Sequence, residues 1–83
     1  MLKPGDKVRM TRELKRRLRG SFSHDHMKEF EDCIGIVVGP VDFNNCAPDH
    51  PDYDPSRVGP EIDVRWQPSN LRYGYHPRDL EKV

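Results

Sequence analysis

The stretch 62-IDVRWQPSNLRYGY-75 decides the fold. Six apolar or aromatic residues in it alternate with polar residues on both sides of a short gap: Ile62, Val64, Trp66, Leu71, Tyr73 and Tyr75. Alternation with a period of two is typical of β-strands that bury one face. The gap, residues 67–70, is a turn sequence in which proline fixes φ at the first central position. We therefore expect a β-hairpin whose apolar positions from Ile62 to Tyr73 form one wall of a core.

The hairpin is followed by 76-HPRDLEKV-83. His76-Pro77 interrupts the strand pattern because proline cannot donate a backbone hydrogen bond. Residues 78–80 are suited to one turn of 3₁₀ helix, and residues 81–83 to a last short strand.

Two further strands are expected before the hairpin. In residues 4–10, Pro4-Gly5 supplies a turn, and Val8 and Met10 alternate with charged residues. The strongest strand pattern in the chain is 33-CIGIVVGPV-41, in which Ile34, Ile36 and Val38 share a face that we expect to point inward. Gly35 would lie on the other face, where a glycine often marks a bulge or a close approach of neighbouring atoms.

Long polar segments separate these strands. Residues 11–20 predict a short helix, with Thr11 as its N-cap, Leu14 and Leu18 on one face and Gly20 at its end. Residues 21–32 favour a further helical turn or two, so the excursion after the first strand covers residues 11–32. Residues 44–60 are rich in proline and aspartate and predict a loop.

The order of these elements resembles the SH3-like small β-barrels. The resemblance rests on the opening PGDKVRM at 4–10, the GIVVG strand at 35–39 and the ending DVRW…LRYGYHPRDLEKV. KOW and Tudor-like barrels have similar openings and endings, and the Mib/Herc2 domain has a similar ending. The resemblance covers about half of the chain and implies a mainly β fold, a small barrel of about five strands. It implies a binding role without naming a ligand, because small barrels carry many functions.

Length and composition suggest one domain spanning residues 1–83, with a small core. No apolar stretch approaches the length of a membrane span, and the N-terminus lacks the apolar region of a signal peptide, so we expect a cytoplasmic protein. Cys33 and Cys46 are expected to stay reduced. The small size and the start at Met1 suit a free-standing accessory protein, for instance one encoded by a phage.

Charge is distributed unevenly along a chain whose net charge is zero. Residues 1–20 carry eight Lys or Arg and two acids, whereas residues 21–63 carry two Lys or Arg and ten acids. Residues 64–83 carry four Lys or Arg and two acids. This asymmetry predicts either a basic face for a polyanion or an acidic partner, or two segments that neutralise each other within the fold.

The basic residues cluster in the predicted helix. Arg12, Lys15, Arg16 and Arg19 follow helical spacing, so they form one stripe while Leu14 and Leu18 face the core. Such a stripe suits phosphate groups, and the alternative is a solvated face paired with the acids of residues 25–32. The candidate residues for binding nucleic acid or another partner are Arg12, Lys15, Arg16, Arg17, Arg19, Arg65, Arg72 and Tyr75.

Other chemistry is weaker in this sequence. Trp66, Tyr73 and Tyr75 suggest an aromatic platform, but their strand positions favour core packing for Trp66. Potential metal ligands are present, but their spacing matches no strong zinc pattern, so we predict no metal and no cofactor. These ligands are His24, His26, Cys33, Cys46, His50 and His76. Cys33, Asp32 and a histidine are the one candidate catalytic set, and nothing in the sequence places them together.

The sequence therefore predicts a binding module without catalytic activity. Its expected partner is nucleic acid or a nucleoprotein, bound through the basic stripe. The alternative is a small protein–protein interaction module, either a regulator or inhibitor or an accessory subunit of an enzyme complex, that binds an acidic protein surface. No membrane partner is expected.

Overall fold

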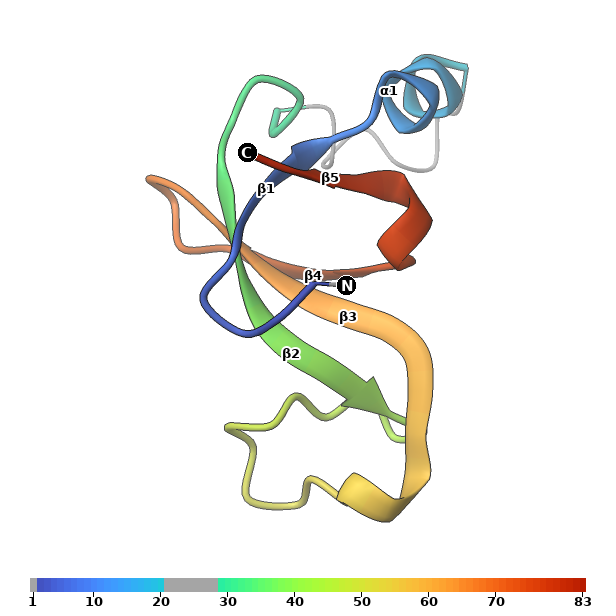
Figure 1. Ribbon diagram of the computed structural model, residues 1–83, viewed down its shortest axis with the longest axis vertical. Coiled ribbons are helices and arrows are strands. Elements are labelled where there is room, and N and C mark those ends of the chain that lie inside the picture. The colour runs from blue at the N-terminus through green and yellow to red at the C-terminus, as the bar shows by residue number, and fades with distance from the viewer. Residues whose placement is uncertain (1, 21–28) are drawn as a thin grey trace.

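The computed structural model describes residues 2–20 and 29–83. In these residues the chain order is β1 (Lys7–Met10), α1 (Arg12–Arg19), β2 (Gly35–Asp42), η2 (Pro55–Arg57), β3 (Val58–Trp66), β4 (Arg72–Tyr75), η3 (Pro77–Asp79) and β5 (Leu80–Lys82), where η denotes one turn of 3₁₀ helix (Figure 1). The predictions of a mainly β fold with five strands and a short helix after the first strand are confirmed. Within these two segments, no helix has the length and apolar character needed to cross a membrane.

The strands form one antiparallel sheet in the order β4-β3-β2-β1-β5. The first strand, β1, lies between β2 and β5, so that Lys7 is opposite Ile36 and Val8 is opposite Lys82. The edge strands are β4 and β5, and no ladder joins them in the part of the chain that the structure describes.

The predicted β3–β4 hairpin is confirmed. Its turn is closed by the backbone N–H of Trp66, which donates to the carbonyl of Leu71 over 2.8 Å, and by the N–H of Asn70, which donates to Trp66 over 2.8 Å. The Gln67–Pro68 peptide bond is cis, and Asn70 has a φ of 64°, a conformation that asparagine tolerates better than most residues.

Trp66 is the centre of the core, as its strand position predicted. Its side chain is fully buried, and Phe30 stacks on it with ring centroids 5.7 Å apart. The indole N–H donates to the hydroxyl of Tyr75 over 2.9 Å, so the one polar atom of the buried ring is satisfied. The other buried members of this cluster are Val8, Met10, Leu14, Leu18, Val37, Ile62, Val64 and Leu80.

The predicted inward face of β2 is wrong. Gly35 and Val37 point inward, whereas Ile34 is 37% exposed and Ile36 and Val38 are only partly buried. The reason is the register, because Gly35 lies opposite Trp66 and its missing side chain leaves room for the indole ring. A Cβ atom on Gly35 would lie 2.9 Å from Trp66 Cε3, so the predicted close approach at this glycine does occur, but on the core side.

The prediction for Leu71 is also wrong, since this residue is 45% exposed. It directly follows the hairpin turn and precedes the first residue of β4, so it lies at the end of the sheet. The apolar wall of the hairpin is therefore shorter than its sequence alternation suggests.

Helix α1 forms as predicted. The Thr11 hydroxyl accepts a hydrogen bond from the backbone N–H of Leu14 over 3.2 Å, Leu14 and Leu18 are buried, and Gly20 caps the end. Of the further helical segment predicted for residues 21–32, residues 21–28 lie outside the described residues. Residues 29–32 form turns.

Residues 44–57, the insert between β2 and β3, form a loop, as predicted, apart from the turn η2, whereas residues 58–60 of the predicted loop belong to β3. The insert lies at the opposite end of the long axis from α1 (Figure 1). The buried carboxylate of Asp42 accepts hydrogen bonds from the backbone N–H groups of Asn44, Cys46 and Asp54, at 2.8, 2.9 and 2.9 Å. These bonds, that from Asp54 first, lower the pKa of Asp42, because they stabilise its charged form.

Candidate functional site

The four stripe residues of α1 line one hollow of about 510 Å³ beside β1. We call it the basic hollow, and its lining residues are Arg9, Met10, Arg12, Lys15, Arg16, Arg19 and Glu81. The helix places its cations there because Leu14 and Leu18 hold the opposite face in the core. The predicted stripe of Arg12, Lys15, Arg16 and Arg19 is thus brought together, and Arg9 of β1 joins it.

Positive charge dominates this hollow, with five cations and one carboxylate in its lining. Arg9 pairs with Glu81 over 3.0 Å and Arg19 pairs with Glu31 over 3.3 Å. Both arginine side chains are well exposed, so these pairs are weak and do not prevent contact with another anion. In residues 2–20 and 29–83, no carboxylate pairs with Arg12, Lys15 or Arg16.

Arg17 lies outside the basic hollow. Its guanidinium donates to the carboxylate of Asp79, a buried residue at the end of η3. The N–H of Thr11 donates to the Asp79 carbonyl over 3.0 Å, so the same residue holds both the start and the last turn of α1. Arg17, predicted as a binding residue, therefore orients the helix that carries the other cations.

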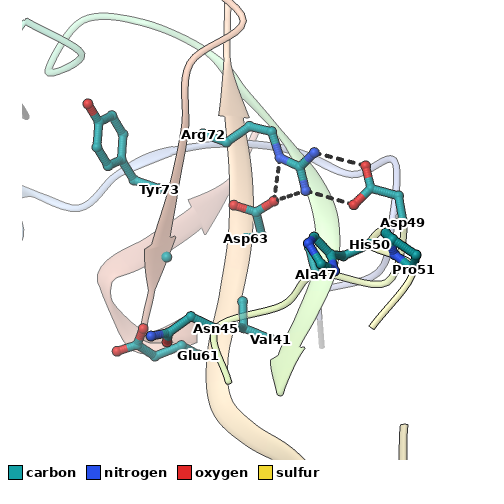
Figure 2. A pocket seen from close by; sticks show the side chains of 11 residues that line it. Val41, Asn45, Ala47, Asp49, His50, Pro51, Glu61, Asp63, Arg72 and Tyr73 are labelled. Carbon is teal, nitrogen blue, oxygen red and sulfur yellow. Dashed lines mark hydrogen bonds and ion pairs between the residues drawn. The ribbon is translucent and has the colours of Figure 1, made fainter. Parts of the chain in front are cut away.

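Arg72 lies at a second hollow, of about 530 Å³ (Figure 2). This hollow is at the β3–β4 end of the sheet, whereas the basic hollow is at the β1–β5 end. We call the second hollow the acidic hollow, and its lining residues are Val41, Asn45, Ala47, Asp49, His50, Pro51, Glu61, Asp63, Arg72, Tyr73 and Gly74. Figure 2 shows the guanidinium of Arg72 between two carboxylates. It donates to both oxygens of Asp49, over 2.8 and 2.9 Å, and its Nε donates to Asp63 over 2.6 Å.

This arrangement engages Arg72, predicted as a binding residue, in contacts within the fold. The hydrogen bonds to Asp49, and then those to Asp63, raise the pKa of Arg72, and the same contact lowers the pKa of Asp49. The carboxylates of Asp49 and Asp63 already accept the hydrogen bonds that the planar guanidinium would otherwise donate to an external phosphate. Arg72 therefore attaches the insert to β3 and β4.

Tyr75, also predicted as a binding residue, lies in the core. Its side chain is 5% exposed, and burial raises the pKa of its hydroxyl to about 12. The hydroxyl accepts the indole N–H of Trp66, so Tyr75 belongs to the core. By contrast, Arg65 is exposed on β3, as predicted, and lies opposite Ile36.

Some residues of these sites were not predicted. Asp49 and Asp63 are 23 and 9 residues away from Arg72 in sequence, and nothing local signals their convergence. Asp42 carries a weak signal, because aspartate before a turn often accepts backbone N–H groups.

The potential metal ligands are not assembled in the part of the chain that the structure describes. No group of three His, Cys, Asp or Glu side chains there is placed to hold a metal ion. Cys33 and Cys46 are free thiols, and the Cys33 thiol lies 3.7 Å from the carbonyl oxygen of Glu29. His24 and His26 lie outside the described residues.

No family model, no curated protein and no solved structure matches this chain.

Proposed function

We propose that this protein is a non-enzymatic binding module with an SH3-like fold that binds nucleic acid through the basic hollow. The strand order β4-β3-β2-β1-β5 supports the fold proposal, as does the 3₁₀ turn η3 between the last two strands. The chain's long excursion after the first strand, which contains α1, fits the same arrangement.

The observation that carries the functional proposal is the convergence of Arg9, Arg12, Lys15, Arg16 and Arg19 on one hollow. A cluster of cations on one side of a small domain creates a positive potential that attracts polyanions. Three of these cations have no carboxylate partner among residues 2–20 and 29–83, which leaves them free to contact phosphates.

The size of the stripe suits a phosphate backbone. From Arg12 to Arg19 the helix rises by about 10 Å, at about 1.5 Å per residue. Phosphates of one strand of duplex DNA follow each other at about 3.4 Å along the axis, so the stripe spans about three of them. Contacts of this kind give affinity without base readout, because cations on phosphates carry no sequence information.

A binding titration with a matched control tests this proposal. Arg16→Glu is expected to weaken binding to a labelled DNA duplex by at least about fivefold at about 0.1 M salt, because it removes one phosphate contact and adds repulsion. Arg57→Glu is the control, since it makes the same charge change in η2, at the opposite end of the molecule from α1 (Figure 1). Its effect should stay within about twofold, because salt screens charges beyond about 10 Å.

Equal losses of DNA affinity in Arg16→Glu and Arg57→Glu would mean that only the net charge of the protein matters. Absence of DNA binding by the wild-type protein would refute the proposal. Buried Trp66 provides the folding control, because its fluorescence should be the same in both variants.

A protein partner is the second candidate, and the exposed apolar residues favour it. Ile34 and Leu71 are 37% and 45% exposed, and both flank the end of β3 at the hairpin turn. An acidic protein surface that docks on the basic hollow would bind equally well after nuclease treatment, whereas a nucleic-acid complex would be lost.

A further inference from the structure

The outer face of the sheet carries a row of residues set by strand register. Lys7 of β1 lies opposite Ile36 of β2, and Ile36 lies opposite Arg65 of β3. Residues that are paired across antiparallel strands point to the same face of the sheet. The row therefore presents one cation on each side of an aliphatic side chain, with no carboxylate between the two cations.

Both cations of this row are exposed. No ion pair joins either to a carboxylate within the described segments. The nearest acid on this face of β3 is Asp63, two residues from Arg65, and it is paired with Arg72. Lys7 and Arg65 are therefore free to contact an external anion.

The row is continuous with the basic hollow. On β1, Lys7 and Arg9 alternate with the buried Val8 and Met10, so both cations point away from the core on the same face. Arg9 itself lines the basic hollow. Lys7 is about 7 Å from Arg9 along the strand, and Arg65 is about 10 Å from Lys7 across two strand spacings.

We propose that the basic hollow is one end of an extended track, and that the phosphate backbone of a nucleic acid runs from α1 over Arg9 and Lys7 to Arg65. This inference rests on the proposed function and adds the path and length of the ligand. The track adds about 17 Å to the 10 Å of the helix stripe. It ends at Arg72, where Asp49 and Asp63 present negative charge.

A pair of probes of different length tests the track. Tripolyphosphate carries enough charge to occupy the basic hollow but is too short to reach Arg65, whereas a single-stranded oligothymidylate of about 16 nucleotides spans the whole path. The variant Lys7→Ala/Arg65→Ala removes both cations of the row. It should bind the oligonucleotide roughly twentyfold more weakly at about 0.1 M salt, from about fivefold for each lost contact.

The same variant should bind tripolyphosphate as the wild-type protein does, while Arg16→Glu should weaken both probes. Arg57→Glu is the control, because it makes the same total change in charge in η2, the turn that lies at the opposite end of the long axis from α1 (Figure 1). Unchanged Trp66 fluorescence confirms that each variant is folded.

Two results would overturn the track. One is oligonucleotide binding that Lys7→Ala/Arg65→Ala leaves unchanged while Arg16→Glu weakens it, which would confine the site to the basic hollow and leave the proposed function intact. The other is equal weakening of both probes by Lys7→Ala/Arg65→Ala, which would indicate a general loss of positive potential. Failure of the wild-type protein to bind the oligonucleotide would refute the proposed function as well. Poly-glutamate of similar charge that binds as tightly, with the same dependence on Arg65, would assign the track to an acidic protein segment.

Discussion

Gly35 shows how a single residue makes room for the core. It is the first residue of β2 and lies opposite Trp66, whose ring occupies the space that a side chain would need. Gly35→Ala would place a Cβ against Val64 Cγ1 and 2.9 Å from the indole, closer than carbon atoms approach without strain. We expect a loss of about 1–3 kcal/mol in the free energy of unfolding, measured by denaturant titration.

Gly20→Ala is the matched control, because a Cβ there would have no atom nearer than 3.7 Å. Its stability should be close to that of the wild-type protein. If Gly35→Ala were equally stable, the packing of Trp66 against β2 would be wrong.

The buried hydroxyl of Tyr75 makes the folded protein less stable at alkaline pH. Burial raises its pKa to about 12 in the folded protein, against 10.0 for an exposed tyrosine. The stabilisation is therefore complete below pH 10 and is lost as the pH rises through about 12, since the unfolded chain ionises first. Denaturant titrations across this range should show stability falling, with a smaller fall in Tyr75→Phe. An identical fall in the variant would contradict the burial of this hydroxyl.

At the scale of elements, the insert between β2 and β3 depends on one carboxylate. Asp42→Asn keeps the size of the side chain but removes the charge that accepts three backbone N–H groups. Because bonds to a charged acceptor are stronger, we expect the amides of Asn44, Cys46 and Asp54 to exchange with solvent about tenfold faster or more.

Hydrogen exchange measured by NMR tests this expectation, with Asp52→Asn as a control on the same loop. The effect of Asp42 has a defined pH range as well. Its pKa is lowered below the ordinary value of 3.8, so the stabilisation is present above that pH and is lost on acidification. Protection that is the same in Asp42→Asn would show that the loop is held by other contacts.

For the whole molecule, the sequence predicted what depends on local patterns. The hairpin, the Thr11 cap of α1 and the turn before β5 follow from alternation, capping and proline placement, and all three form. The cations of α1 also came together as predicted, because helical spacing alone decides which of them share a face.

Features that depend on tertiary contacts were not predictable. Ile34, Ile36 and Val38 match an inward face by pattern, but the register against Trp66 gives that face to Gly35 and Val37. Arg72 had every property of a free basic residue, and only the folded insert brings Asp49 to it. The folded insert therefore gives the acidic hollow its excess of carboxylates, whereas cations dominate the basic hollow, although arginine lines both.

The most direct test of the central claim is the salt dependence of DNA binding by the basic hollow. For the wild-type protein, a plot of log affinity against log salt concentration should have a slope of about −3 or steeper, since about 0.9 is contributed by each of three or more phosphate contacts on a duplex. The triple variant Arg12→Ala/Lys15→Ala/Arg16→Ala should make the slope shallower by about 2.7, because it removes three contacts of about 0.9 each. A wild-type slope near zero, or a triple variant with an unchanged slope, would contradict the claim that these cations bind a phosphate backbone.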